Sequence, residues 1–179
     1  MLKPMPRQQG MTLVEIMISL VVLGVLIMVA LPEFSAWLQN QQLRAATEGS
    51  LNGLQIARAE AIRRNTLVQL VMGPGTGWTV SDAASGALIQ SKVHEEGAAN
   101  ANVAITPGGS TTVSFTPLGG VGANTDGSAA ITQLDFTNPT GGSCQPTGRM
   151  RCLRVVITGG GSLKMCDPVV ALPDARACP

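Results

Sequence analysis

The chain has 179 residues, with 12 Lys and Arg against 11 Asp and Glu for a net charge of +1, and this length fits one membrane anchor and one folded domain rather than two soluble domains. Aromatic residues make up only 3% while glycine (21) and proline (11) are abundant, so the core must consist of aliphatic residues in short strands joined by turns. One histidine and few acids also argue against an enzyme.

The N-terminus combines a short basic leader, residues 1–10, with an apolar segment, residues 11–31. As a helix rising about 1.5 Å per residue, the segment would span roughly 30 Å, the thickness of a bilayer's hydrocarbon core. A secretory signal peptide has its small-residue cleavage site after the apolar region, whereas Gly10 comes before it. A cut after Gly10 would therefore keep the anchor.

An acidic residue, Glu15, stands within the apolar segment. A charge at the centre of a bilayer costs about 2.5–3.5 kcal/mol, and Glu15 near the end of the segment would cost less. After a cut, the amine of Met11 would lie one helical turn away, and the same amine of a neighbouring subunit can pair with the carboxylate. We therefore expect Glu15 to set the register of an assembly.

The order of basic residues, glycine, an apolar residue and a glutamate resembles the N-terminal signature of type IV pilins and pseudopilins, in Lys3, Arg7, Gly10, Met11 and Glu15. The resemblance implies that a prepilin peptidase cuts after Gly10 and methylates the amine of Met11. It also implies a single pass through the inner membrane, a domain in the periplasm, and assembly with other pilins. The alternative is an ordinary signal anchor, because Lys3 and Arg7 by themselves satisfy the positive-inside bias.

A second helical pattern follows the apolar segment. Pro32 interrupts the helical pattern, which resumes and gives an amphipathic stalk helix over residues 32–64. Its small-residue face would let a sheet approach closely, while polar residues such as Arg44 and Glu48 occupy the other face. The residues at helical spacing on the small-residue face are Leu43, Ala46, Thr47, Ser50, Leu54, Ala57 and Ala61.

From Asn65 the period changes from helix to strand, which predicts a β-rich domain over residues 65–179. The fold class is therefore α+β, a long N-terminal helix packed on a mostly antiparallel sheet. Gly159-Gly160-Gly161 predicts a terminal hairpin, and we expect residues 119–130 to form a mobile loop. The predicted strands are 66–72, 78–81, 88–93, 103–106, 111–116, 131–136, 150–158 and 162–166.

All four cysteines lie in the last fifth of the chain. An anchor that delivers the domain outside the cytoplasm makes disulfides the default. Of the three possible connectivities, the shortest loops favour Cys144 with Cys152 and Cys166 with Cys178. Zinc is the alternative, although the spacings lack a C-x-x-C pair and His94 is remote in sequence.

Several further motifs resemble the GspH/FimT minor pseudopilins: the helix end at residues 57–64, Gly77-Trp78, residues 115–119 and residues 165–168. The resemblance implies a minor subunit that helps to initiate or cap a type IV pilus or a type II secretion pseudopilus. Such subunits carry no catalytic site of their own.

The C-terminal end is basic, and the resemblance raises DNA uptake as an alternative function. Gly148-Arg149-Met150-Arg151 fits the letters of the family's G-R-x-R motif for DNA, but that motif belongs to the terminal strand, where this chain has Gly161-Ser162-Leu163-Lys164. Alternating positions on a strand project to one face, so phosphates of double-stranded DNA could be contacted by four basic residues. The simpler interpretation is a sheet edge protected by charges. The four candidates are Arg149, Arg151, Arg154 and Lys164.

For catalysis the sequence offers only His94, which stands beside Glu95 and Glu96 in a polar segment typical of a surface histidine. A Ser/His/Asp arrangement stays open, because its members need not be neighbours in sequence. We expect no catalytic residue, no metal and no cofactor.

Overall fold

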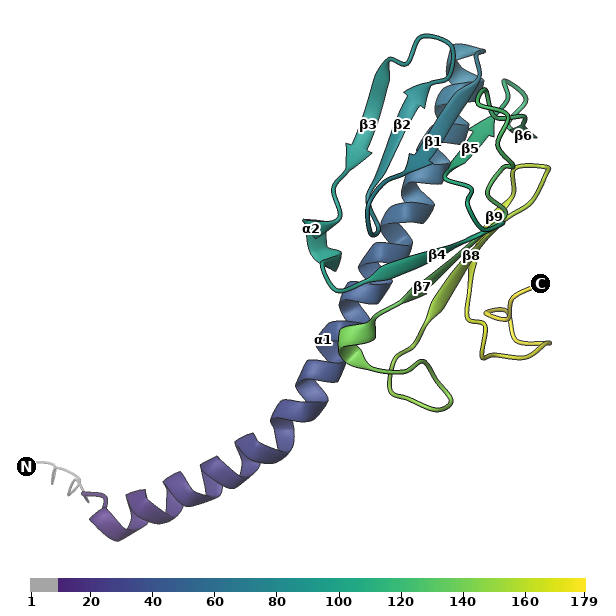
Figure 1. Ribbon diagram of the computed structural model, residues 1–179. Helices are drawn as coiled ribbons and strands as arrows, with labels where there is room; N and C mark the ends of the chain where they lie inside the picture. The colour runs from purple at the N-terminus through teal and green to yellow at the C-terminus, as the bar shows by residue number, and fades with distance from the viewer. Residues whose placement is uncertain (1–9) are drawn as a thin grey trace, which may run out of the picture. The chain divides into compact units, whose positions relative to one another are not determined.

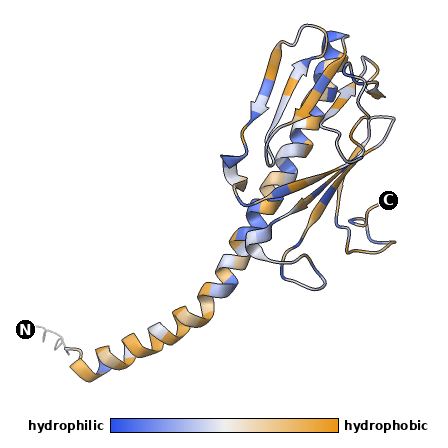
Figure 2. Ribbon diagram, viewed as in Figure 1, coloured by the Kyte–Doolittle hydropathy of each residue, from blue (hydrophilic) through white to orange (hydrophobic). Residues whose placement is uncertain are grey.

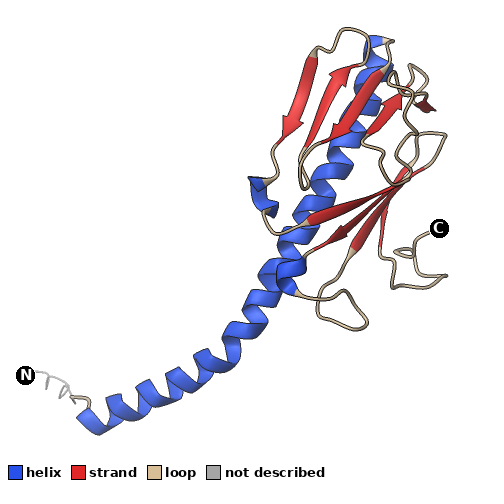
Figure 3. Cartoon of the chain, in the orientation of Figure 1, coloured by secondary structure: helices blue, strands red, loops and turns tan. Residues whose placement is uncertain are grey.

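The computed structural model describes residues 10–179 (Figure 1). The leader residues Lys3 and Arg7 lie outside this described part. The fold is a long N-terminal helix followed by antiparallel sheets (Figure 3), which confirms the predicted α+β class.

Helix α1 (Leu13–Arg64) is continuous through Pro32, where the sequence pattern is interrupted. The carbonyl of Pro32 accepts a hydrogen bond from Ser35 Oγ at 2.9 Å. The described chain forms two compact units, divided between Ser35 and Ala36, so α1 contributes to both.

The C-terminal end of α1 is closed by a Schellman motif. Asn65 has a φ of +53°, the left-handed conformation that asparagine tolerates better than most residues. Its N–H donates to the carbonyl of Ile62 at 3.4 Å, and the N–H of Thr66 donates to the carbonyl of Ala61 at 3.3 Å. These bonds satisfy carbonyls that a helix end leaves free, and the chain then enters the first strand.

The part of α1 within the second unit buries one face, as its helical spacing predicts. All seven predicted residues are buried, and Gly53 joins them. Because these residues are mostly small, β-strands can pack closely on the helix. The buried face consists of Leu43, Ala46, Thr47, Ser50, Gly53, Leu54, Ala57 and Ala61.

The first sheet contains five antiparallel strands. Their order across the sheet is β3 (Leu88–Lys92), β2 (Trp78–Asp82), β1 (Val68–Met72), β5 (Thr112–Phe115) and β6 (Val121–Gly122). Leu70 of β1 lies opposite Val80 on one side and Val113 on the other, and all three are fully buried. This row gives the sheet its aliphatic core face.

The second sheet contains four antiparallel strands. Their order is β4 (Asn102–Thr106), β7 (Gln133–Thr137), β8 (Leu153–Ile157) and β9 (Leu163–Cys166). The short helix α2 (Glu95–Ala98) precedes β4, and the 3-10 turn η1 (Pro139–Gly141) follows β7. The predicted terminal hairpin is present as β8 and β9, and Gly161 at its turn has a φ of +77°.

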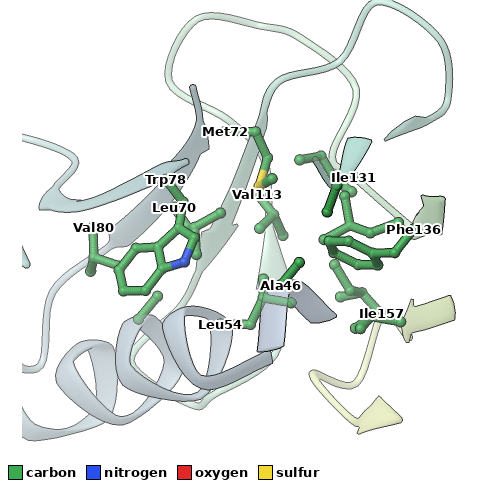
Figure 4. Close-up of a cluster of buried hydrophobic side chains, with 14 of the residues drawn as sticks. Ala46, Leu54, Leu70, Met72, Trp78, Val80, Val113, Ile131, Phe136 and Ile157 are labelled. Atoms are coloured by element: carbon green, nitrogen blue, oxygen red, sulfur yellow. The ribbon is translucent and has the colours of Figure 1, made fainter. Parts of the chain in front are cut away.

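The core lies between the two sheets and the second half of α1. Figure 4 shows Trp78 and Val113 from the first sheet and Phe136 and Ile157 from the second, gathered around Leu54 of α1. All five are fully or almost fully buried. Both sheets thus pack on the same face of the helix, so the domain has a single core.

The sequence analysis misplaced the start of β8 and missed β6. The predicted strand 150–158 begins only at Leu153, because the backbone of Met150 pairs within the preceding loop, with Ser143 and Gln145. The expected mobile loop 119–130 contains β6 and a buried Asn124, whose Nδ2 donates to the carbonyl of Thr112 at 3.0 Å.

Candidate functional site

The first candidate site is the start of α1, which Thr12 caps. Thr12 Oγ1 accepts a hydrogen bond from the backbone N–H of Glu15 at 3.3 Å, and its carbonyl accepts one from Ile16 at 3.2 Å. Thr12-Leu13-Val14-Glu15 has the spacing of a capping box, a signal that the sequence analysis did not use. Glu15 lies exposed in the first turn of α1. The positive end of the helix dipole stabilises its negative charge there.

The first half of α1 after Glu15 is predominantly hydrophobic (Figure 2). Among the described helices, α1 alone is long and apolar enough to cross a membrane, and none of its most apolar stretch is buried. Large apolar side chains from Leu13 to Leu31 are exposed. A surface of this kind is covered by lipid or by other protein chains. The hydroxyl of Ser19 is satisfied inside the helix by the carbonyl of Glu15 at 2.8 Å.

Two disulfides join the cysteines in the pairing that short loops favour, Cys144 with Cys152 and Cys166 with Cys178. No cysteine is left free, so the zinc alternative has no thiolate to use. The first disulfide closes the loop that carries Arg149 and Arg151.

Arg149 and Arg151 do not alternate on a strand, contrary to the sequence analysis. They lie in the disulfide loop before β8, and the side chain of Asn40 on α1 holds this loop. Asn40 Nδ2 donates to the carbonyl of Arg149 at 3.3 Å, and the N–H of Arg151 donates to Asn40 Oδ1 at 2.7 Å. The backbone of this segment is thus held by a helix side chain and not by a neighbouring strand.

The loop and the helix enclose a hollow of about 600 Å³, here named the arginine groove. Its apolar lining includes Leu153 and Met165, and its polar lining includes Asn40, Gln41 and Gln145. The charged residues that line it are Arg44, Arg149, Arg151, Arg176 and Asp167.

Several arginines of the groove have carboxylate partners. Arg44 Nε lies 2.7 Å from Glu48, and Arg151 Nε lies 3.4 Å from the buried Asp167. A third pair joins Arg176 to Asp174 at 2.8 Å. The Arg176 guanidinium is the main reason that the pKa of Asp174 falls to about 2. The sequence analysis missed Arg44 and Arg176, which are far from Arg149 in sequence.

The other two DNA candidates lie elsewhere. Arg154 of β8 forms an ion pair with Asp135 of β7 at 2.6 Å. Lys164 of β9 donates from Nζ to the carbonyl of Ala177 at 2.9 Å. Neither residue lines the arginine groove. The structure therefore brings together two of the four candidates, Arg149 and Arg151, and separates the others.

His94 is half-buried and structural in its contacts. Its Nδ1 accepts a hydrogen bond from the backbone N–H of Thr76 at 3.1 Å and lies 3.2 Å from the hydroxyl of Thr76. Within residues 10–179, no three His, Cys, Asp or Glu side chains are grouped so that they could hold a metal ion.

The architecture and the exposed apolar helix together define a pilin-like protein with a membrane anchor. The family model for the type II transport protein GspH matches residues 46–161, and the model for the prokaryotic N-terminal methylation motif matches residues 5–31. The chain belongs to the GspH family. Membership implies assembly with other pilins, and the methylation motif implies processing by a prepilin peptidase.

Solved structures agree with this fold. The chain is similar to the type IV minor pilin FimU of Pseudomonas aeruginosa PAO1 in two crystal forms. In the first the identity is 17% and the TM-score 0.52, over 73% of this chain and 92% of FimU. In the second the identity is 16% and the TM-score 0.51, over 73% and 97%. No individually curated protein matches the chain at a significant level.

Proposed function

We propose that this minor pilin or pseudopilin helps to initiate or cap a filament, either a type II secretion pseudopilus or a type IV pilus. The observation that supports this role is the exposed apolar half of α1, which needs either lipid or partner helices around it. Lipid gives little hydrophobic force between helices, so association depends on close packing and on polar contacts. Gly24 has open space beside it and permits such packing.

Cleavage after Gly10 creates one of the two groups that form the polar contact. The cut frees the amine of Met11 at the start of α1, next to the turn that carries Glu15. In the filament, the Glu15 carboxylate of one subunit pairs with the Met11 amine of a neighbour. An unpaired charge in apolar surroundings costs several kcal/mol, so only the register that pairs the two groups is stable.

The folded domain lies in the periplasm in this proposal. Its two disulfides suit an oxidising compartment, and the positive residues of the leader remain in the cytoplasm. In this proposal the protein acts by assembly, and its single histidine has a structural contact, a hydrogen bond from the backbone N–H of Thr76.

The test replaces Glu15 by valine. Glu15→Val is expected to leave membrane insertion intact and to lower incorporation into filaments by about tenfold or more, because the partner amine is left unpaired. Incorporation is measured as the amount of the protein in sheared and purified filaments, relative to the amount in the inner membrane.

Two further variants make this test specific. Glu15→Gln keeps the shape but not the charge, and is expected to fail like the valine variant. Ser19→Ala removes a hydroxyl of the same segment that bonds only within the helix, and is expected to assemble normally. Normal incorporation of Glu15→Val would overturn the pairing.

A further inference from the structure

The edge of the second sheet is open at β9. The N–H of Thr158 donates to the carbonyl of Ser162 at 3.0 Å, so these two residues form a hydrogen-bonded pair. Along an antiparallel hairpin, hydrogen-bonded pairs alternate with pairs whose backbone groups point away from the partner strand. Leu163 and Met165 therefore direct their backbone N–H and C=O away from β8. Within residues 10–179, no hydrogen bond outside the sheet ladders uses these backbone groups.

The same edge already pairs with another part of the chain one residue beyond β9, where a turn near the C-terminus contacts Asp167. The N–H of Asp167 donates to the carbonyl of Arg176 at 2.8 Å, and Asp167 forms an isolated parallel bridge with Ala177. The residues at the two open positions also line hollows in the surface. Met165 lines the arginine groove, and Leu163 lines a second hollow of about 610 Å³ with Arg58 of α1.

We propose that the arginine groove binds an extended acidic peptide segment of a partner protein, which adds as a strand to the free edge of β9. Backbone hydrogen bonds to Leu163 and Met165 would hold the segment in register. Its acidic side chains meet Arg149 and Arg151, and its apolar side chains contact Leu153. Arginine has five N–H donors, so an arginine beside an internal carboxylate can still bind a second one.

The observations favour a peptide over DNA. The lining includes apolar side chains. A phosphate oxygen can accept from the N–H groups of an open strand edge, but it offers no donor to the C=O groups, whereas a peptide strand satisfies both. This binding needs only the folded domain, so its failure would leave the proposed role in a filament untouched.

The experiment measures binding of a labelled peptide of about eight residues, alternating glutamate and valine, to the full chain in detergent micelles. A peptide alternating lysine and valine is the charge control. An acidic peptide N-methylated at every second residue tests the strand edge, because it cannot donate those backbone hydrogen bonds. A short double-stranded DNA is offered as the competing ligand.

We expect the acidic peptide to bind in a salt-sensitive manner. Arg149→Gln with Arg151→Gln is expected to weaken binding by about tenfold, since charge-assisted hydrogen bonds are lost. The matched control is Arg63→Gln, an exposed arginine of α1 outside both hollows, which should bind like the parent. N-methylation is expected to weaken binding by about tenfold as well.

Three results would overturn the proposal. They are equal binding of the acidic and basic peptides, full binding by the N-methylated peptide, and DNA retention that depends on Arg149 and Arg151 while the acidic peptide does not bind. Unchanged disulfide mapping and far-UV circular dichroism of the double variant establish that a loss of binding is not a loss of fold.

Discussion

Gly53 lets α1 approach the first sheet closely. A Cβ atom at this position would lie 2.7–2.9 Å from ring atoms of Trp78, which is only 3% exposed and belongs to the hydrophobic core. Gly49, one helical turn earlier, faces only the flexible end of Lys92. A side chain at position 53 would therefore clash with a buried ring, whereas a side chain at position 49 would displace only the end of a flexible lysine.

Gly53→Ala is therefore expected to lower the stability of the domain by about 1–2 kcal/mol. The clash costs about 1–3 kcal/mol, and the gain in helix propensity of up to about 1 kcal/mol offsets it only in part. Gly49→Ala has the same gain while Lys92 swings aside, so it should raise stability. Thermal or urea unfolding of both variants checks the pair, and a stabilised Gly53→Ala would contradict the packing described.

Asp82, at the end of β2, gives the domain a pH-dependent contribution. The N–H and hydroxyl of Ser85, followed by the hydroxyl of Thr66, lower the pKa of Asp82 from 3.8 to about 2. A carboxylate whose pKa is lower in the folded state stabilises the fold above its unfolded pKa, near 3.8. This contribution is lost as the pH falls towards 2.

We expect Asp82→Asn to lower the Tm at pH values above about 5, with a difference from the parent that shrinks by about pH 2.5. The amide keeps the size of the carboxylate but not its charge, so the pH dependence reports the ionised form. Paired thermal melts across this range provide the measurement. A Tm difference that is constant with pH would show that the charge is irrelevant.

At the scale of the elements, α1 also organises the loop that precedes β8. Asn40 offers one donor and one acceptor to the backbones of Arg149 and Arg151. Its neighbour Gln39 accepts at Oε1 from Asn138 Nδ2 at 2.8 Å. Two adjacent helix residues thus hold the connection between β7 and β8 at both of its ends.

Asn40→Ala is expected to cost about 1–2 kcal/mol, because two hydrogen bonds are removed and the N–H of Arg151 loses its partner. Hydrogen exchange at the Arg151 amide should accelerate more than exchange in β8. Gln41→Ala, an exposed neighbour with no such bonds, is the control. Equal protection of the Arg151 amide in the parent and in Asn40→Ala would contradict this arrangement.

Most elements could be predicted because each has a local signal. The alternation of apolar residues predicts the strands, and the helical spacing predicts the buried face of α1. What the sequence could not show is long-range. The division of the strands into two sheets, the pairing of Asn40 with a loop more than a hundred residues later and the gathering of Arg44 with Arg149 all depend on tertiary contacts.

Short elements were missed for a different reason. β6 has two residues in a glycine-rich stretch, and pairing with β5 rather than local propensity creates it. The start of β8 was predicted too early because alternation continues through Met150, whose backbone the disulfide loop uses. At the N-terminus, by contrast, Gly10, Met11 and Glu15 form a local pattern, and their roles stay predictions for experiment.

At the scale of the whole molecule, the position of Gly10 before the apolar segment makes a prediction about processing. Gly10→Val is expected to block cleavage, while both the cleaved parent and the uncleaved variant stay in the membrane fraction, because the anchor follows the cut. N-terminal mass analysis of membrane and soluble fractions checks both statements. Gln9→Ala should be cleaved normally, and release of the cleaved parent from the membrane would contradict the prediction.

Helix α1 divides its residues between two environments along its length. Every buried residue of α1 lies between Leu43 and Ala61, and residues 10–35 are exposed throughout. Loss-of-function alleles in this helix should therefore fall into two groups. Alleles in the first half lower filament yield with an unchanged melting temperature, whereas alleles in the second half lower the melting temperature first. A chain that begins at Ala36 retains every buried residue of the domain and isolates the second group.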